Sequence, residues 1–321
     1  MLKQLGRCFG FFGILGFSVM LGYLSGCAKG KDAASPQSNQ KVGQASPAFP
    51  KIKGAQIPPG AKPKVWKNIQ KIVMVVLENT DYEDAVTQPF LKQLAAKGAL
   101  LNNYSAVTHP SQPNYIAMIA GDTLGVTDDE NVTLNGSHLG DLMEAGKKTW
   151  KSYAEGFPEK CFLGANSGRY YRKHVPFLSF ASVQKNPTQC AKIVNGNKFI
   201  PDVETHSLPN FSFYTPDIYN DGHDSGIAYA DRWLSDFFQK LTKTPNVLNY
   251  TLFIVTFDEG SNNRNNRVAT LLMGAGIQEG ATSDRAYNHY SLLKTIENIY
   301  GLSHLGKQDQ SAIAIDDVWI E

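Results

Sequence analysis

The residues best suited to chemistry occur in residues 108–115, Thr-His-Pro-Ser-Gln-Pro-Asn-Tyr, where a serine stands between prolines. The apolar residues that follow predict a buried helix, so Ser111 lies near a helix start. Unpaired backbone N–H groups and the helix dipole favour an anion at such a position, for example a phosphoryl oxygen. On this segment alone, the alternative role of a simple helix cap fits Ser111 equally well.

Polar side chains follow three separate apolar runs. Glu-Asn follows residues 71–77, Asp-Glu follows residues 250–257, and an aspartate-rich segment, residues 217–224, follows residues 210–214. Each acidic residue taken alone is explained by a turn or a helix cap, but several like charges at one sheet edge require a cation. Oxygen ligands suit a hard divalent ion such as Mg²⁺, Ca²⁺ or Mn²⁺ better than a thiolate-type zinc site. The oxygen-rich set next to Ser111 is Glu78, Asn79, Asp258 and Glu259.

Two histidines accompany these segments and form a second, softer group of candidates. His223 and His289 could bind a second metal together with Asp217, or act as proton donors and phosphate ligands. A histidine in a loop is more often structural or simply exposed. The histidines assigned to that class are His138, His174, His206 and His304, while His109 is left unassigned.

Apolar runs alternate with segments of helical spacing from residue 66 onward. Residues 71–77 and 250–257 are continuous apolar runs, typical of strands covered on both faces of a largely parallel sheet. Further strands are expected at residues 98–104, 149–153, 210–214 and 268–273, and helices at residues 90–98, 139–147, 228–241 and 291–300. The alternation predicts an α/β three-layer sandwich, a mostly parallel central sheet with helices on both faces. Sites in such folds form beyond the carboxyl ends of the strands.

The first residues have the layout of a secretory signal. Lys3 and Arg7 precede an apolar run that ends in Leu-Ser-Gly-Cys, and the glycines and short length disfavour a retained membrane span. This ending resembles the bacterial lipoprotein signal, which implies lipidation of Cys27 and, with Ala28 next, the outer membrane of a Gram-negative bacterium, facing the periplasm or the cell surface. Residues 1–26 are therefore predicted to be the signal peptide, residues 27–65 a flexible tether, and residues 66–321 the catalytic domain.

The net charge, the cysteines and one loop-rich region add further expectations. A net charge of +2 argues against a nucleic-acid partner that relies on a strongly basic surface. In an exported, oxidising setting Cys161 and Cys190 are predicted to form a disulfide, with two unrelated buried thiols as the alternative. Residues 156–200 are loop-rich and aromatic and are expected to form a cap or the walls of a substrate site. The sequence leaves the oligomeric state open.

The order of the motifs resembles a known family. Glu-Asn, His-Pro-Ser-x-Pro-Asn-Tyr, Thr-Pro-Asp with Asn-Asp-Gly-His-Asp, Phe-Asp-Glu-Gly and His-Tyr-Ser-Leu-Leu occur in this order between Lys71 and Leu302. They are similar to those of the phosphoesterase family of acid phosphatases and phospholipases C, within the alkaline phosphatase superfamily. At Asp-Glu and at Glu-Asn the chain differs from alkaline phosphatase proper, which has Asp-His and Asp. This difference argues against a full two-zinc site and favours the acid phosphatase branch.

The resemblance implies a role for each matching residue. Ser111 is expected to attack phosphorus and become phosphorylated, with His223 and His289 as the other catalytic residues. Asn114 and Asp221 are expected to bind substrate, and the resemblance does not separate the roles of Asp217, Asp221 and Asp224. The residues expected to hold a divalent ion, whether Mg²⁺, Ca²⁺, Mn²⁺ or Zn²⁺, are Glu78, Asn79, Asp258, Glu259 and Asp217.

The leading hypothesis is therefore a lipid-anchored, metal-dependent acid phosphatase that cleaves phosphomonoesters through a phosphoserine. An acidic pH optimum would follow if the proton-donating histidine must be charged. A phospholipase C type phosphodiesterase of the same family is the first alternative, because the motifs leave the second ester arm open. A surface lipoprotein that only binds an anion is the second. A serine hydrolase is disfavoured because Gly-x-Ser-x-Gly is absent.

Overall fold

The computed structural model of the protein describes residues 64–261 and 265–320. The predicted signal peptide, Cys27 and nearly all of the predicted tether lie outside these residues. The described part begins with a short 3₁₀ helix, η1 (Lys64–Asn68), that leads into the first strand. Within the described ranges, none of the helices has the length and apolar character needed to cross a membrane.

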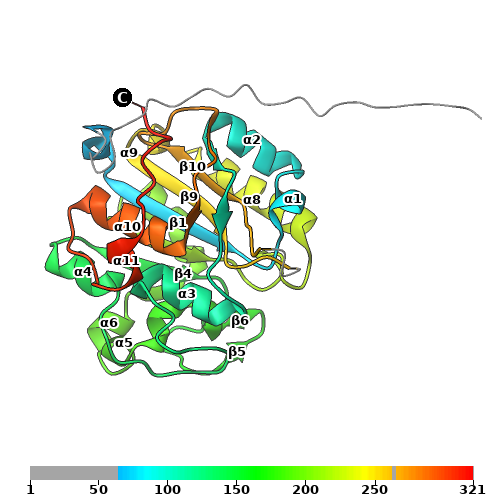
Figure 1. Cartoon of the computed structure of the whole chain (residues 1–321). Helices are drawn as coiled ribbons and strands as arrows, with labels where there is room; N and C mark the ends of the chain where they lie inside the picture. Colours follow the sequence, from blue (N-terminus) through cyan, green and yellow to red (C-terminus); the bar gives the residue numbers. More distant parts are fainter. Residues whose placement is uncertain (1–63, 262–264, 321) are drawn as a thin grey trace, which may run out of the picture. The chain divides into compact units, whose positions relative to one another are not determined.

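An eight-stranded sheet forms the centre, in the order β11-β2-β10-β9-β1-β8-β4-β7 (Figure 1). Strand β10 runs antiparallel to both of its neighbours, and the other adjacent pairs are parallel. This arrangement confirms the predicted α/β sandwich with a mostly parallel sheet. The strands are β1 (Lys71–Leu77), β2 (Ala99–Leu101), β4 (Trp150–Ala154), β7 (Ile193–Asn195), β8 (Phe211–Thr215), β9 (Thr251–Phe257), β10 (Thr270–Gly274) and β11 (Ala281–Ser283).

The two central strands explain why their sequences are continuously apolar. Every residue of β9 is buried, as is every residue of β1 after Lys71. Both faces of these strands are covered by helices, so neither strand needs a polar, solvent-facing side. The register pairs Leu77 of β1 with Phe257 of β9, and both strands therefore end at the same level.

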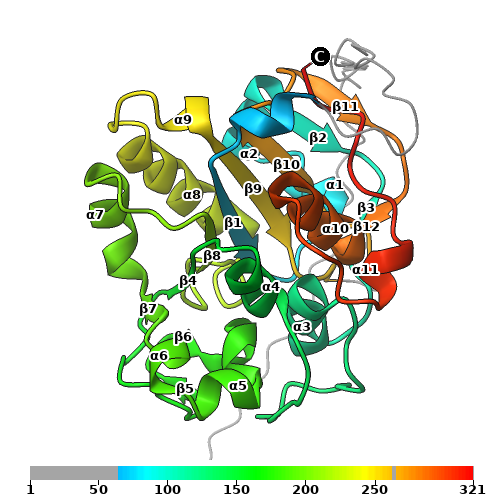
Figure 2. The ribbon, with the colours of Figure 1, turned by 90° about the vertical axis from the view of Figure 1, so that its left-hand side faces the viewer.

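Helices cover both faces of the sheet. Helices α2 (Pro89–Lys97) and α8 (Ile227–Leu241) contact each other on one face, and α3 (Ser111–Ala120) and α10 (His289–Tyr300) contact each other on the opposite face (Figures 1 and 2). Helix α8 is amphipathic, whereas all ten residues of α3 are buried. The remaining helices of the two faces are α1 (Tyr82–Ala85), α4 (Leu139–Ala145), α7 (Phe199–Glu204), α9 (Val247–Tyr250) and α11 (Gln308–Ser311).

A small lobe is inserted between β4 and β8, in the region where the sequence predicts loops. Its elements are β5 (Asn166–Ser167), β6 (Tyr170–Tyr171), η2 (Arg172–His174), η3 (Pro176–Ser179), α5 (Ala181–Gln184), α6 (Pro187–Cys190), β7 and η4 (Gly196–Lys198). Outside the lobe, β3 (Tyr104–Ser105) pairs with β12 (Tyr287–Asn288).

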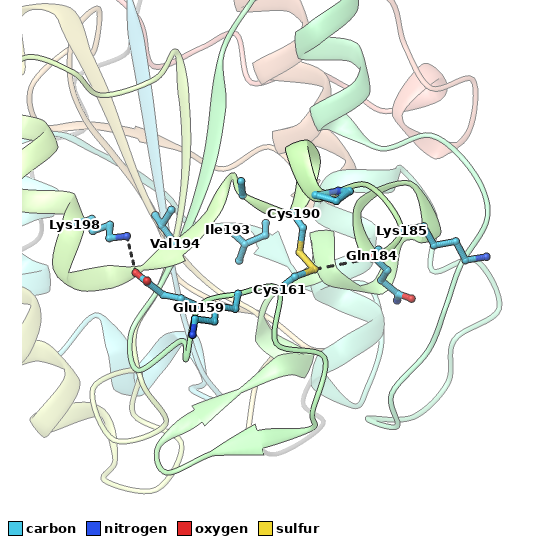
Figure 3. Close-up of a pocket in the computed structure, with 11 residues that line it drawn as sticks. Glu159, Cys161, Gln184, Lys185, Cys190, Ile193, Val194 and Lys198 are labelled. Carbon is cyan, nitrogen blue, oxygen red and sulfur yellow. Dashed lines mark hydrogen bonds and ion pairs between the residues drawn. A yellow bond between two sulfur atoms is a disulfide. The ribbon is translucent and has the colours of Figure 1, made fainter.

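The predicted disulfide is confirmed, because Cys161 and Cys190 are bonded with their Cα atoms 5.5 Å apart. The disulfide lines a pocket of about 530 Å³ together with apolar and lysine side chains of the lobe (Figure 3). Glu159 and Lys198 form an ion pair of 2.6 Å at this pocket. None of the strand-end carboxylates lines it, so this cavity is separate from the site described next.

Candidate active site

The site begins where β1 and β9 end side by side. Glu78 and Asn79 leave β1 next to Asp258 and Glu259, which leave β9. The backbone N–H of Asn79 donates to Asp258 Oδ1 at 3.0 Å, and the N–H of Thr80 donates to the carbonyl of Glu259 at 3.1 Å. The two polar pairs are thus locked together by backbone hydrogen bonds. Asn79 has a positive φ of 38°, a conformation that asparagine tolerates better than most residues.

Ser111 is the first residue of α3 and points into this group of carboxylates. Its Oγ lies 3.1 Å from Glu78 Oε2 and 3.3 Å from Glu259 Oε1, and the side chain is buried. The next N–H of the helix, on Gln112, donates to Asp129 Oδ1 at 2.9 Å. Ser111 therefore contacts acidic side chains from both central strands at the start of a buried helix.

A second group of ligand atoms adjoins Glu78. Glu78 Oε1 accepts a hydrogen bond from Tyr115 at 2.5 Å and lies 3.3 Å from His174 Nε2. The other ring nitrogen of His174 lies 3.5 Å from Asp221 Oδ2. One ligand atom from each of Glu78, His174 and Asp221 lies within 4.8 Å of the others, and all three residues are buried. Glu78 thus belongs to two adjoining sets of possible ligands.

Burial and mutual repulsion shift the pKa values of these groups strongly. Burial, together with the charges of Asp258 and Asp221, raises the pKa of Glu78 well above its usual range. Burial raises the pKa of Asp221 to about 8 and that of Asp258 to about 6. Burial and the Asp258 charge raise the pKa of Glu259 to about 8. Four buried carboxylates are costly unless a cation offsets them.

Lys173 brings a positive charge to this group of carboxylates. The Lys173 ammonium forms an ion pair of 2.8 Å with Asp129 Oδ2 and interacts electrostatically with Glu78 and Asp258. His174 adds no full charge, because burial and the nearby Lys173 hold its pKa well below the usual value. Among residues 64–261 and 265–320, Lys173 is the one lysine that acts on Glu78 and Asp258, and its single charge leaves the four carboxylates under-compensated.

The donor set fits a divalent cation. Among the described residues, the buried Asn79 Oδ1 and Asp258 Oδ2 have no hydrogen-bond partner. Two unpartnered oxygens beside ionisable carboxylates are what a hard divalent ion requires. The residues that could hold such an ion are Glu78, Asn79, Asp258 and Glu259, adjoined by Asp221 and His174.

Two predicted residues lie close to the site but have their polar atoms engaged elsewhere. His289 is buried, with Nδ1 3.0 Å from the Tyr104 hydroxyl and Nε2 2.8 Å from the Asp258 carbonyl, and burial lowers its pKa to about 4. Asn114 hydrogen-bonds to backbone groups of the loop before Ser111 through both side-chain atoms, including the N–H of Val107 at 3.0 Å. These contacts fit positioning of Asp258 and of the Ser111 loop better than direct contact with substrate.

The aspartates of residues 217–224 have different roles, because one lies in the site and another closes a turn. Asp221 joins the site, whereas Asp217 Oδ1 accepts the N–H groups of Tyr219 and Asn220, both at 3.0 Å, and closes a turn. His223 is about one-third exposed, and its Nδ1 lies 2.8 Å from Asp224 Oδ1. His223 is near enough to His174 to contribute to lowering the pKa of that buried ring. It therefore lies at the solvent side of the site.

Sequence reasoning did not select Lys173, His174, Tyr115 or Asp129 for the site. His174 and Lys173 lie on the short helix η2 of the inserted lobe, with no apolar strand before them to mark a sheet edge. Tyr115 follows Ser111 by one helical turn, so helical spacing could have indicated it. His109, left unassigned, forms an ion pair with Glu259 and lies at the mouth of the site with its side chain one-third exposed.

Comparison with known proteins agrees with this fold. A model of the phosphoesterase family matches residues 56–303. The chain belongs to that family. The fold is similar to the solved structure of a protein in the alkaline phosphatase superfamily from Vibrio parahaemolyticus, with a TM-score of 0.56 over 83% of this chain and 76% of that one, at 15% identity.

Two curated relatives are similar in sequence. A probable acid phosphatase from Kluyveromyces lactis is 37% identical over 262 residues, which span 78% of this chain but only 62% of that protein. A phosphatidylinositol-3-phosphatase from Mycobacterium tuberculosis is 35% identical over 258 residues, which span 77% of this chain and 82% of that protein.

Proposed function

We propose that the protein is a metal-dependent phosphatase that hydrolyses phosphomonoesters through a phosphoserine formed on Ser111. The observation that carries this proposal is the Ser111 hydroxyl at the start of α3, 3.1 Å from Glu78 and 3.3 Å from Glu259. Both curated relatives are named as phosphatases, which supports the same reaction class.

In the first half-reaction Ser111 Oγ attacks phosphorus while Glu259 or Glu78 accepts the hydroxyl proton. The new Oγ–P bond forms as the bond from phosphorus to the ester oxygen breaks. His223, held through Nδ1 by Asp224, gives a proton to the departing alcohol. In the second half-reaction water attacks the phosphoserine and gives a proton to the now neutral His223. The Oγ–P bond breaks as the protonated carboxylate returns its proton to Ser111 Oγ, which releases phosphate and free Ser111.

The carboxylates and Asn79 would hold the divalent cation, which would neutralise charge on the phosphoryl oxygens and lower the pKa of the serine hydroxyl. Glu78, Asn79, Asp258 and Glu259 form the primary set of ligands in this proposal. Asp221 and His174 extend it beside Glu78. In place of the roles expected from the sequence, His289 positions Asp258, Asn114 positions the Ser111 loop, and Asp217 shapes the turn that presents Asp221.

Trapping the phosphoserine tests the proposal. The protein is mixed with p-nitrophenyl phosphate and a divalent ion, quenched in acid and digested, and the Ser111 peptide is expected to gain one phosphoryl group. Ser111→Ala should abolish this mass shift and lower kcat by at least 10³-fold, as loss of a covalent nucleophile does. Ser152→Ala is the matched control, because this serine is buried on β4 and its Oγ has no hydrogen-bond partner among the described residues.

Comparison of substrates separates the alternatives. Faster hydrolysis of p-nitrophenyl phosphate than of its bis-ester or of phosphatidylcholine is expected of a phosphomonoesterase. The reverse preference would identify the phospholipase C type phosphodiesterase. Turnover that survives Ser111→Ala unchanged would overturn the nucleophile assignment, and inactivity of the wild type with Mg²⁺, Ca²⁺, Mn²⁺ and Zn²⁺ would favour the anion-binding alternative.

The same proposal includes export and lipid anchoring through Cys27. The basic start, the apolar run and the Leu-Ser-Gly-Cys ending support it. Acylation would hold the domain on a membrane without a spanning helix, at the outer membrane if the source is Gram-negative. Metabolic labelling with palmitate is expected to mark the wild type but not Cys27→Ala, and equal labelling of the two would refute the anchor.

A further inference from the structure

A second buried cluster of ligand-type side chains lies away from Ser111. Glu297 on α10 and His304 in the following loop form an ion pair, with Oε2 and Nδ1 2.6 Å apart. Asp309 on α11 completes the cluster, in which one ligand atom from each residue lies within 4.8 Å of the others. Glu297 and Asp309 are fully buried, whereas the His304 side chain is about one-third exposed. The cluster therefore has a closed acidic floor and one side that reaches solvent.

The cluster is short of positive charge and leaves one polar atom without a partner. Glu297 Oε1 is buried and, among the described residues, accepts no hydrogen bond. A protonated His304 balances only one of the two carboxylates. The charge of Lys294 acts on Glu297 from a distance, but its ammonium donates to the carbonyl of Gln310 at 2.6 Å, and Lys307 donates to that of Ala120 at 3.1 Å. An unpartnered carboxylate oxygen in such a place requires either a proton or a cation.

Backbone hydrogen bonds fix the third residue of the cluster. Asp309 Oδ2 accepts the N–H of Leu305 at 2.6 Å, and Oδ1 accepts the N–H of Lys307 at 2.9 Å. Each oxygen keeps a further lone pair for a metal ion. The three ligand atoms lie within 4.8 Å of one another, and Zn²⁺ takes nitrogen and oxygen ligands at roughly 2.0–2.2 Å.

The cluster also lies next to the carboxyl end of α3, the helix that begins at Ser111. The N–H of Gln308 donates to the carbonyl of Gly121, the residue that ends α3, at 3.0 Å. A Cβ at Gly121 would lie 2.5 Å from Asp309 Oδ1, so the close approach of these two residues needs glycine. Figures 1 and 2 show α11 beside α10 near the end of α3. An ion bound by Glu297, His304 and Asp309 would therefore connect α10 and α11 to each other next to the end of α3.

We propose that Glu297, His304 and Asp309 form a structural Zn²⁺ site, separate from the Ser111 site. Two carboxylates and one imidazole are ligands of the type that Zn²⁺ accepts, and the exposed side at His304 leaves a position for water. The ion would offset the excess negative charge and occupy the unpartnered Glu297 oxygen. It would also cross-link the elements that hold the carboxyl end of α3.

Zinc counting and anomalous scattering test the site directly. The full-length protein, stripped with chelator and dialysed against micromolar Zn²⁺, is expected to lose one zinc per chain on His304→Gln, measured by mass spectrometry of the metal. Glu297→Gln is a second variant that keeps the side-chain shape. His206→Gln is the matched control, because His206 is exposed and outside the cluster. Crystals of the wild type should show a zinc anomalous peak between the three side chains.

The readouts separate this site from the Ser111 site. Zinc bound only at the strand-end carboxylates would give the same zinc content in wild type, His304→Gln and Glu297→Gln. That result, or an absent anomalous peak at the cluster, would overturn the proposal and leave a proton shared by Glu297 and Asp309 as the explanation. The outcome does not depend on phosphatase activity, so a failure of the proposed function leaves this test intact.

Discussion

Removal of the Tyr115 hydroxyl tests whether Glu78 is a metal ligand that this hydroxyl orients. It donates to Glu78 Oε1 at 2.5 Å, and both residues are fully buried. Tyr115→Phe removes the donor without removing the ring, which also stacks on His174 at 5.2 Å. A hydrogen bond contributes about 0.5–1.5 kcal/mol when its acceptor is neutral and about 1.5–3 kcal/mol when the acceptor is charged, so the metal-free protein should lose roughly 1–12 °C in Tm.

The same substitution should weaken metal binding. Glu78 keeps its Ser111 contact but loses one of the groups that orient its carboxylate toward the neighbouring donors. Loss of such a supporting hydrogen bond typically costs about 10–100-fold in metal affinity. We therefore expect the concentration of Mg²⁺ or Mn²⁺ that gives half-maximal phosphatase activity to rise by that factor, with a smaller effect on kcat at saturating metal.

A matched substitution elsewhere provides the control. The Tyr153 hydroxyl donates to Asp202 Oδ2 at 2.6 Å, a tyrosine–carboxylate bond of the same type outside the site. Tyr153→Phe should lower Tm but leave the metal dependence of activity unchanged. If Tyr115→Phe and Tyr153→Phe show the same metal dependence as the wild type, Glu78 is not a metal ligand and the reasoning fails.

Three further predictions concern pH, the disulfide and the serine loop. Folding raises the pKa of Asp221 from 3.8 and of Glu259 from 4.5 to about 8 each, so the folded metal-free protein binds more protons than the unfolded chain. Its stability should therefore fall as pH rises between those limits, and a thermal melt series in chelator that showed rising stability would contradict this. The disulfide between Cys161 and Cys190 closes a loop with a sequence separation of 29. Replacing both cysteines with serine should therefore lower the free energy of unfolding by about 3–4 kcal/mol, measured by urea unfolding. An unchanged urea midpoint would contradict this prediction. Asn114→Ala leaves buried backbone groups of the serine loop without partners, so it should lower the free energy of unfolding by about 2–4 kcal/mol and also lower kcat. A normal kcat at reduced stability would exclude a role of Asn114 in placing Ser111.

The strand-end part of the site could be predicted because it depends on local sequence. The apolar runs that became β1 and β9 determine where those strands end, and Glu78 and Asp258 follow directly. Parallel strands with a shared register bring such endings together, as the pairing of Leu77 with Phe257 shows. Ser111 could be placed for a similar reason, since a helix start is set by the apolar spacing that follows it.

Only the tertiary structure decided which loop residues join Ser111 and the strand-end carboxylates. Lys173 and His174 lie far along the chain from both strands, and the path of the inserted lobe places them beside Glu78. The same holds for His289, whose motif suggested contact with the phosphoryl group but whose ring nitrogens engage Tyr104 and the Asp258 carbonyl. Residue type and spacing predict which chemistry a chain can perform, whereas side-chain direction depends on packing contacts between segments that the sequence pattern does not connect.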